Sequence, residues 1–581
     1  MTIQESDILY TIFRNIYTNQ RLLSESTGHS LGVVNKSIKS LISQGYLDDN
    51  ISITNQARKE FENNAPKTAI ILAAGFGMRM VPINTQTPKA LITVDGETLI
   101  ERIIKQLHEV GIQDIYVVVG FMKEQFEYLI DEYGVELIIN EEYASRNNLH
   151  SLYLASAHLS NSYIIPCDIW ADRNPFSTHE LYSWYMVTDI VDEESSVRVN
   201  RKMELVSVSS DQAGNSMIGI SYLVEKDAKI VRERLQKYDC DKQYNDAFWE
   251  EVLYEKDRMI VPAKVVHASD YVEINTYEQL RELDEESNHL KSDAIDVIVK
   301  IFKVNSMDIE NIEVLKKGMT NRSFLFTCKN KKYIMRIPGE GTDQLINRKE
   351  EAAVYDVIAG KGICDNVIYI NPDNGYKITE YIENSRVCDA NDNNDLSICL
   401  KKLREFHALN LKVDHTFDIF GQIEFYESLW HGAPSVYRDY AKTKENVFLL
   451  KEYIDAQEKN YCLTHIDAVP DNFLFTKEDV YLIDWEYAAM QDPHVDIAMF
   501  CIYAMYDREQ IDHLIDIYFE DNCKLEIRIK IYCYIAACGL LWSNWCEYKR
   551  SLGVEFGEYS LRQYRYAKDF YKIVREELKR V

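Results

Sequence analysis

The sequence of 581 residues has few basic side chains relative to acidic ones. Its 65 lysines and arginines stand against 93 aspartates and glutamates, which gives a formal net charge of −28. This excess of negative charge opposes non-specific binding to nucleic acid and to anionic membrane surfaces, because both carry the same sign. It does not exclude a local basic site that binds a nucleotide.

Paired cysteines and long apolar segments are also missing. None of the 12 cysteines precedes Cys167 and none belongs to a Cys-x-x-Cys pair, a pattern that indicates a reducing compartment instead of a disulfide framework or a zinc site. The longest strongly apolar run, residues 531–542, is too short to span a bilayer. Residues 1–7 show no basic segment followed by an apolar run, so we expect no signal peptide. We therefore predict a cytoplasmic protein without membrane insertion.

The pattern of expected elements changes twice along the chain, near residue 67 and near residue 290. With 46% hydrophobic residues, the composition is ordinary for globular domains with real cores. The acidic, polar stretch 283–293 is typical of a linker. We predict three domains, at residues 1–66, 67–290 and 291–581, and find no internal repeat.

Residues 1–66 predict a small helical unit. Apolar side chains recur at helical spacing after Asp7, Asn19 and Ser30, and residues 51–54 are typical of a short strand. This order resembles a winged helix-turn-helix domain. Six lysines and arginines against seven carboxylates leave the segment slightly negative, whereas a DNA reader needs a basic footprint. We expect a structural or oligomerisation role, with nucleic-acid binding as the less favoured alternative.

Residues 67–290 alternate between apolar strands and amphipathic helices. Residues 68–73 predict a buried strand that runs into glycine, residues 99–108 predict a helix, and residues 115–119 predict a second buried strand. Further strands are expected at 137–139 and 163–166. This alternation predicts an α/β doubly wound domain.

A glycine-rich segment, LAAGFGMR at residues 72–79, follows the first of these strands, and TPKAL follows at residues 87–91. Glycines at a strand end let the backbone curl and place N–H groups against phosphates, and arginine and lysine add cations for them. A glycine-rich turn alone is weak evidence, but glycines, arginine and the Pro-Lys pair at this spacing are strong evidence. We assign catalysis to Arg79 and Lys89, and nucleotide binding to Leu72, Ala73, Ala74, Gly75 and Gly77.

These segments resemble those of nucleotidyltransferases that join a nucleoside triphosphate to a phosphomonoester. The resemblance implies that Asp168, after the strand at residues 163–166, holds Mg²⁺. It places a second metal-binding segment at residues 271–276, where many relatives carry aspartate at the position of Asn275. Glu273 and Asn275 therefore both remain candidates for the second ligand. For Asp168, the alternative is a cap or turn carboxylate.

Residues 147–153, NNLHSLY, resemble the corresponding segment of bacterial phosphocholine cytidylyltransferases, as do Tyr143 and the FWEE patch at residues 248–251. Aromatic faces with nearby carboxylates suit a quaternary ammonium. The resemblance implies CTP and phosphocholine as substrates. It assigns substrate binding to Tyr143, Asn148, Ser151 and Trp249, with a core position as the alternative for Trp249.

Residues 291–581 predict a small sheet-bearing lobe followed by a helical lobe, an α+β layout like that of protein kinases. In HIDAVPDN at residues 465–472, a histidine, Asp467 and Asn472 have the spacing of a kinase catalytic loop. Asp467 would orient or deprotonate the attacking hydroxyl, while Asn472 and Asp484 would ligate Mg²⁺. Residues 492–498 match the segment that braces this loop. Three aligned elements oppose a chance register of surface carboxylates.

This region resembles the choline kinase and aminoglycoside phosphotransferase superfamily, and choline kinases more closely. The resemblance implies that residues 318–323 cover the phosphates and that residues 377–382 form the hinge for adenine. Arg336 would clamp ATP phosphates, with Glu351 as its helix partner and the adjacent Glu350 as the other candidate. The remaining implied nucleotide contacts are Thr320, Asn321, Glu380 and Ile382.

Trp542 and Trp545 lie three residues apart on an expected helix and therefore share one face. This segment resembles the paired-tryptophan helix that lines the choline site of choline kinases, and Trp485 is a further substrate-binding candidate. The alternative is that the paired tryptophans belong to the hydrophobic core.

Together, the two signatures predict a bifunctional enzyme that phosphorylates choline with ATP and then transfers CMP from CTP to phosphocholine. Both steps need Mg²⁺ to neutralise a polyphosphate. Family analogy suggests phosphocholine decoration of a bacterial surface glycan. The alternatives are ethanolamine, another amino alcohol or a sugar as substrate, and a DNA-binding regulator with degenerate metabolite-sensing domains. The intact Lys89, Asp168, Asp467, Asn472 and Asp484 oppose the regulator.

Overall fold

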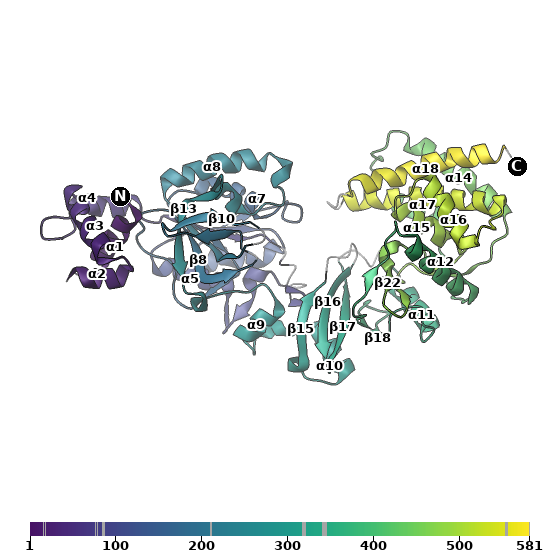
Figure 1. The fold of residues 1–581 in the computed structure, drawn as a ribbon, viewed down its shortest axis with the longest axis horizontal. Helices are drawn as coiled ribbons and strands as arrows, with labels where there is room; N and C mark the ends of the chain where they lie inside the picture. The colour runs from purple at the N-terminus through teal and green to yellow at the C-terminus, as the bar shows by residue number, and fades with distance from the viewer. Residues whose placement is uncertain are drawn as a thin grey trace. The chain divides into compact units, whose positions relative to one another are not determined.

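The computed structural model divides the chain into two compact units, Met1–Ser292 and Asp293–Val581. Figure 1 shows their elements. The structure describes all residues except 16, 18, 76, 78, 79, 84–86, 194, 210, 211, 316–320, 340–344, 552–555, 580 and 581.

The first unit begins with four helices: α1 (Ile3–Arg14), α2 (Gln20–Thr27), α3 (Leu31–Ser43) and α4 (Asn55–Asn63). The predicted cap Ser30 begins α3, since its hydroxyl accepts a hydrogen bond from the amide of Val33. The strand expected at residues 51–54 is reduced to a single bridge between Leu47 and Ile53, and α4 follows it. The winged-helix likeness of this segment therefore stays a prediction.

The four helices pack against the rest of the first unit. Leu181 shares their hydrophobic core, and the Tyr182 hydroxyl donates to Asp7 Oδ1 at 2.7 Å. Phe13 stacks on Phe61 with ring centroids 4.0 Å apart, and the His179 ring packs edge-on against Phe13. Residues 1–66 are thus seated on the segment that surrounds residue 180.

A ten-stranded mixed sheet forms the centre of the first unit, in the order β5-β4-β1-β6-β11-β8-β13-β10-β9, with β12 beside β13. Its strands are β1 (Thr68–Ala73), β4 (Asp114–Val119), β5 (Glu136–Ile139), β6 (Ser162–Pro166), β8 (Trp184–Asp192), β9 (Val197–Val199), β10 (Glu204–Ser207), β11 (Gly214–Leu223), β12 (Tyr254–Glu255) and β13 (Arg258–Val266). β1 runs parallel to both β4 and β6, whereas β11 is antiparallel to β6 and β8.

Helices cover both faces of this sheet, as Figure 1 shows. Ala69, Ile71 and Ala73 of β1 enter one hydrophobic cluster, and Ile70 and Leu72 enter another. Alternate side chains of a strand point to opposite faces, so burial of both sets confirms the predicted doubly wound α/β layout. The flanking helices are α5 (Leu99–Glu109), α6 (Tyr128–Tyr133), α7 (Asn148–Leu154) and α8 (Glu225–Asp239), and α9 (Tyr277–Leu283) follows near the end of the unit.

The second unit starts with α10 (Asp293–Phe302) and a five-stranded antiparallel sheet in the order β15-β16-β17-β19-β18. Its strands are β15 (Ile309–Val314), β16 (Asn321–Cys328), β17 (Lys331–Pro338), β18 (Val367–Ile370) and β19 (Lys377–Glu380), and α11 (Arg348–Ile358) lies between β17 and β18 in sequence. This is the predicted sheet-bearing lobe.

A helical lobe follows, with short strand pairs that carry its loops. Its helices are α12 (Asn393–Ala408), α13 (Ile419–Ser428), α14 (Tyr440–Ala456), α15 (His494–Tyr503), α16 (Arg508–Phe519), α17 (Leu525–Ser551) and α18 (Glu558–Glu577). Every residue from 529 to 546 of α17 is buried, so this helix is the central element of the lobe. No helix among the described residues combines the length and hydropathy needed to cross a membrane.

Candidate active sites

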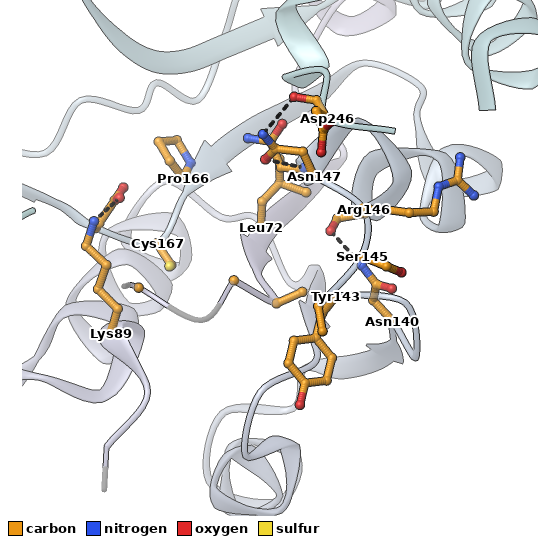
Figure 2. Close-up of a pocket in the computed structure, with 17 residues that line it drawn as sticks. Leu72, Lys89, Asn140, Tyr143, Ser145, Arg146, Asn147, Pro166, Cys167 and Asp246 are labelled. Atoms are coloured by element: carbon orange, nitrogen blue, oxygen red, sulfur yellow. Dashed lines mark hydrogen bonds and ion pairs between the residues drawn. The ribbon is translucent and has the colours of Figure 1, made fainter. Parts of the chain in front are cut away.

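The first unit holds a cavity of about 400 Å³ at the carboxyl ends of β1 and β6. Ligands of open α/β sheets bind at this edge. Of the predicted residues, Leu72, Ala74, Gly75, Gly77, Lys89, Tyr143, Asn148, Ser151 and Asp168 line it. Figure 2 shows Lys89 on one side of the cavity and Tyr143 and Asn147 beyond Leu72. Ala73, with 4% exposure, points instead into the sheet core.

Lys89 bridges two oxygen ligands at one end of this cavity. Its Nζ donates to Asp168 Oδ2 at 2.5 Å and to Asn275 Oδ1 at 2.6 Å. Gly77 lies against the Lys89 side chain, where an added Cβ would come within 3.3 Å of the Lys89 Cβ, and Gly77 has a φ of 61°. Glycine at this position therefore allows both the backbone turn and the close approach of the lysine.

A two-stranded ladder brings Asn275 to this point. β7 (Ile169–Ala171) follows Asp168 directly and pairs with β14 (Tyr271–Glu273), and the amide of Ile274 donates to the Asp168 carbonyl at 3.0 Å. Asn275 is therefore carried to Lys89, whereas the Glu273 residue is exposed. The side-chain oxygens of Asp168 and Asn275 lie close together, since both contact the Lys89 ammonium. They could therefore hold a divalent cation, because Mg²⁺ prefers oxygen ligands and often takes only one or two from the protein.

The opposite end of the cavity is built from the loop before α7 and from α7 itself. Asn148 Oδ1 accepts a hydrogen bond from the Trp249 amide at 2.7 Å, and Ser151 Oγ accepts one from Asn140 Nδ2 at 3.0 Å. Tyr143 packs closely on Gly120, where an added Cβ would lie 2.7 Å from the Tyr143 Cβ. Gly120, directly after β4, is thus a positioning residue that the sequence patterns did not single out.

The FWEE patch is divided between surface and interior. Phe248 is 62% exposed, whereas Trp249 is 1% exposed and packs in a hydrophobic core; it is not among the described residues that line the cavity. The Tyr185 hydroxyl donates to Glu250 Oε1 at 3.0 Å, and burial raises the pKa of Glu250 to about 7. Trp249 was predicted to bind substrate, but in the structure it is a core residue, which was the alternative interpretation.

Arg146 is a cavity residue that the sequence patterns missed. It lies in the loop before α7, and its Nη2 donates to Asp239 Oδ1 at 2.6 Å and to the Asp239 carbonyl at 2.7 Å. His150 Nδ1 contacts the same carboxylate oxygen at 2.7 Å. A shared carboxylate on α8 thus fixes the loop against the helix.

The second unit holds a cavity of about 510 Å³, here called the catalytic cavity. The predicted residues Asn321, Arg336, Asp467, Asn472, Asp484, Trp542 and Trp545 line it. They come from both sheets and helices, so the fold brings together segments more than 200 residues apart in the sequence. Predicted contacts through Arg79 in the first unit and Thr320 in the second lie outside the described residues.

Asp496 holds the predicted catalytic loop. Its carboxylate accepts hydrogen bonds from the amides of His465 at 3.0 Å and Ile466 at 2.7 Å, and it contacts His407 Nε2 at 2.9 Å. Ile466 has a φ of 69°, a conformation that is costly for a β-branched residue. The two amide hydrogen bonds stabilise this turn, which ends at Asp467.

Asp467 and Asn472 are linked inside the loop. Asn472 Nδ2 donates to the Asp467 carbonyl at 2.9 Å and to Asp467 Oδ2 at 3.2 Å. Burial, Asp484 and Glu486 raise the pKa of Asp467 to about 8, and burial and Asp484 also raise the pKa of Glu486 to about 7. Asp484 thus lies close enough to raise the pKa of both Asp467 and Glu486, and a divalent cation among the three carboxylates would offset that repulsion.

The described residues contain no preformed cluster of three or more His, Cys, Asp or Glu side chains suited to a metal ion. The predicted ligands Asn472 and Asp484 would supply one amide oxygen and one carboxylate, and Mg²⁺ commonly takes its remaining ligands from water and phosphates.

Arg336 pairs with Glu351 through two hydrogen bonds, of 2.5 and 2.9 Å. Burial raises the pKa of Glu351, but Lys377, Arg336 and Arg348 together hold it at about 2. Glu350 is exposed. Of the two candidates, Glu351 is thus the partner in the structure, and the buried ion pair fixes the guanidinium beside the catalytic cavity.

Aromatic rings form another wall of the catalytic cavity. The Trp542 and Trp545 rings meet at 5.4 Å, and Tyr487 packs edge-on against Trp542 at 5.8 Å. Trp542 is 8% exposed and Trp545 is 2% exposed, so both tryptophans belong to the core and line the cavity as well. Tyr487, Tyr503 and Tyr559 also line it and were not predicted.

Trp485 and the predicted hinge residues Glu380 and Ile382 are not among the described residues that line the catalytic cavity. Trp485 is fully buried, its Nε1 donates to the Leu482 carbonyl at 2.8 Å, and it is absent from the described lining of the catalytic cavity. Glu380 and Ile382 line a neighbouring cavity of about 440 Å³, here called the hinge cavity. Asp365 lines both cavities.

The two units of the chain match two different families of known proteins. Residues 69–180 match the MobA-like NTP transferase domain, and residues 312–537 match the choline/ethanolamine kinase family. Over 222 residues, the chain is 35% identical to the choline-phosphate cytidylyltransferase of Streptococcus pneumoniae, covering 37% of this chain and 96% of that protein. The chain belongs to the choline-phosphate cytidylyltransferase family.

This family member also resembles two further proteins. It is 33% identical to the 2-aminoethylphosphonate cytidylyltransferase of Lancefieldella rimae, over 38% of this chain and 94% of that protein. It is 28% identical to Protein LicA of Haemophilus influenzae, over 42% of this chain and 96% of that protein. A cytidylyltransferase domain and a choline kinase domain are therefore fused in one polypeptide.

Proposed function

We propose that the chain phosphorylates choline with ATP and then transfers CMP from CTP to the resulting phosphocholine, giving CDP-choline and pyrophosphate. The observation that carries this proposal is that one chain holds two separate sites. Phosphocholine, the product of the kinase reaction in the second unit, is the substrate of the cytidylyltransferase reaction in the first unit. The Lys89 site has the residues for nucleotidyl transfer, and the Asp467 site has those for phosphoryl transfer.

In the kinase reaction, the choline oxygen attacks the γ-phosphorus of ATP, and the bond to the β-phosphate oxygen breaks. Asp467 accepts the hydroxyl proton or orients that hydroxyl, since Asn472 fixes its carboxylate. Arg336, held by Glu351, meets the phosphates. The trimethylammonium cannot donate an N–H hydrogen bond, so the faces of Trp542 and Trp545 are suited to select it.

In the cytidylyltransferase reaction, a phosphate oxygen of phosphocholine attacks the α-phosphorus of CTP, and pyrophosphate leaves. Lys89 stabilises the charge that develops on the triphosphate. Mg²⁺, which Asp168 and Asn275 would hold here and Asn472 and Asp484 would hold in the kinase site, supplies charge neutralisation for both polyphosphates. Tyr143 and the loop before α7 face the remainder of the cavity.

Two finer assignments belong to the same proposal. Cytoplasmic location is supported by cysteines that are all free among the described residues. Phosphocholine decoration of a surface glycan as the use of CDP-choline rests on family analogy.

A coupled assay with the full chain tests the proposal. Labelled choline with ATP should give phosphocholine, and addition of CTP should convert it to CDP-choline. Ethanolamine and 2-aminoethylphosphonate are the competing acceptors, and UTP is the competing nucleotide. Failure to form phosphocholine from choline, or faster turnover of a competitor in either step, would overturn the assignment of that step.

A further inference from the structure

Asp365 occupies the boundary between the catalytic cavity and the hinge cavity of the second unit. It lies two residues before β18, and β18 pairs with β19, the strand that ends in the predicted hinge. The Glu380 amide donates to the Asn366 carbonyl at 2.9 Å. These contacts place the Asp365 backbone beside the segment expected to bind adenine.

The Asp365 carboxyl group is only partly satisfied. Its Oδ1 is buried without a hydrogen-bond partner among the described residues. Burial raises the pKa of this carboxyl, while the Lys377 ammonium and a hydrogen bond from Thr379 lower it. Lys377 is also engaged elsewhere, since its Nζ donates to the Tyr355 hydroxyl at 2.7 Å. A ligand that donates an N–H hydrogen bond to Asp365 Oδ1 would remove the cost of leaving this buried acceptor unpaired.

Several other carboxylates near these cavities have partners or proposed roles. Glu351 is held by Arg336, and Glu380 pairs with Lys331 at 3.1 Å and accepts from Asn366 at 3.0 Å. Asp467 and Asp484 belong to the reacting end of the catalytic cavity. Glu383 and Glu478 also line the hinge cavity, but both are exposed. Asp365 is therefore the carboxylate beside the hinge that offers a buried oxygen without a partner among the described residues.

The catalytic cavity also offers apolar lining that suits a flat aromatic base. Leu315, Ile334 and Ile483 supply apolar side chains to the same catalytic cavity, and Thr379 lies on β19 one residue before Glu380. Apolar side chains can hold both faces of a purine, so polar groups at the rim decide which purine binds.

We propose that Asp365 selects adenine over guanine by accepting a hydrogen bond from the exocyclic amino group of the base. Guanine carries a carbonyl oxygen at that position, and this oxygen would face the carboxylate without a shared hydrogen. A buried acceptor that is left unpaired penalises the wrong ligand. The proposal rests on the ATP-dependent kinase function and names the residue that sets its nucleotide preference.

Binding of ADP and GDP to the full chain, measured by calorimetry without any amine, tests this role. In Asp365→Asn the side chain keeps its shape and offers an N–H group to the guanine carbonyl. We expect weaker ADP binding and tighter GDP binding, so that the ADP-over-GDP preference falls by about tenfold or more. The matched control is Asp373→Asn on the turn between β18 and β19, where the aspartate side chain is 81% exposed, and its preference should equal that of the unmodified chain.

Two further measurements separate recognition from folding. Asp365→Ala removes the acceptor without adding a donor, and thermal unfolding of each variant reports its fold. Purine riboside diphosphate lacks the amino group, so its affinity should be the same in the unmodified chain and Asp365→Ala. An unchanged ADP-over-GDP preference in folded Asp365→Asn, or an equal loss for both nucleotides, overturns the proposal.

These outcomes differ from failure of the proposed function. If the unmodified chain does not phosphorylate choline but the nucleotide preference shifts as expected, the amine assignment fails while the role of Asp365 stands. If choline is phosphorylated and the preference does not shift, the role of Asp365 fails while the kinase function stands.

Discussion

At the scale of single residues, Lys89 is the proposed phosphate-binding cation of the first unit. It contacts both Asp168 and Asn275. Lys89→Ala should lower the rate of CDP-choline synthesis about 10²-fold or more, because a cation that meets developing charge contributes roughly 3 kcal/mol. Phosphocholine formation should persist in the same protein, since the second unit has its own phosphate-binding arginine.

Product analysis with CTP and phosphocholine measures this effect, with ATP and choline assayed in parallel. Lys229→Ala on α8 is a matched control, because Lys229 is exposed. Near-normal CDP-choline synthesis by Lys89→Ala would show that the loop has been misassigned.

His465 makes the second unit sensitive to acid. It is fully buried, and burial lowers its pKa to about 4, below the ordinary value of about 6.5. The unfolded chain therefore binds a proton near pH 6.5 that the folded chain does not bind until about pH 4. Stability is fully present above pH 6.5 and is lost as the pH falls toward 4, by about 3 kcal/mol for this group.

Denaturant unfolding at pH 7 and pH 5, followed by tryptophan fluorescence, tests whether the free energy of unfolding falls as the pH falls. His465→Gln should show a smaller difference between the two pH values than the unmodified chain. His431→Gln, at an exposed position, should retain the full difference. An equal pH dependence in all three proteins would contradict the assignment of the effect to His465.

At the scale of elements, helix α17 places Trp542 and Trp545 both in the core and in the wall of the catalytic cavity, and we propose that they recognise choline there. Trp542→Ala and Trp545→Ala should raise the KM for choline, because each cation–π contact contributes about 0.5–2 kcal/mol. The KM for ATP should change little. The preference for choline over ethanolamine should also narrow, since ethanolamine can still donate N–H hydrogen bonds.

Both tryptophans are buried, so the alanine variants need a folded control. Trp545→Phe keeps a ring face and should restore much of the choline affinity that Trp545→Ala loses. Steady-state kinetics decides the point: an unchanged KM for choline, or equal losses for choline and ethanolamine, would assign these tryptophans to packing alone.

At the scale of the whole molecule, residues 1–66 carry none of the described catalytic contacts, yet they pack on the segment around Tyr182. A truncated chain starting near Pro66 should keep both activities. Its first unit should unfold at a lower temperature, because removal of the four helices uncovers Leu181 and leaves the Tyr182 hydroxyl without Asp7.

Activity assays and thermal unfolding of the truncated chain test these two statements separately. Tyr182→Phe in the full chain is a smaller perturbation of the same contact, since it removes only the hydrogen bond to Asp7. It should lower the unfolding temperature less than the truncation does. Loss of either turnover in a truncated protein that remains folded would mean that residues 1–66 complete an active site.

The sequence was sufficient for the elements that local patterns define. Alternation of apolar strands and helices predicted the doubly wound domain, and the spacing of Asp467 and Asn472 predicted residues that do line one cavity. Family resemblance pointed to Asp168, but its direct contact with Lys89 was not predicted.

Choices that depend on long-range packing could not be made in advance. Asn275 reaches Lys89 because β14 pairs with β7, and sequence spacing alone does not reveal that pairing. Trp249 and Trp542 were both predicted to bind substrate, but Trp249 is absent from the described lining of the first unit's cavity, whereas Trp542 lines the catalytic cavity. Gly120 is needed because of the side chain that packs on it, which lies 23 residues later.

Helix α15 connects the two ends of the substrate site. Asp496 on this helix holds the loop that ends at Asp467, and Met499, three residues later, accepts a hydrogen bond from Trp542 Nε1 at its Sδ, at 3.2 Å. With the roles proposed for Asp467 and Trp542, this one helix would fix the separation between the base that meets the hydroxyl and the wall that faces the ammonium. We therefore expect the site to act as a molecular ruler for the two-carbon spacer of choline. A three-carbon homologue should bind through its ammonium yet turn over more slowly, and equal kcat values for the two alcohols would show that no such ruler operates.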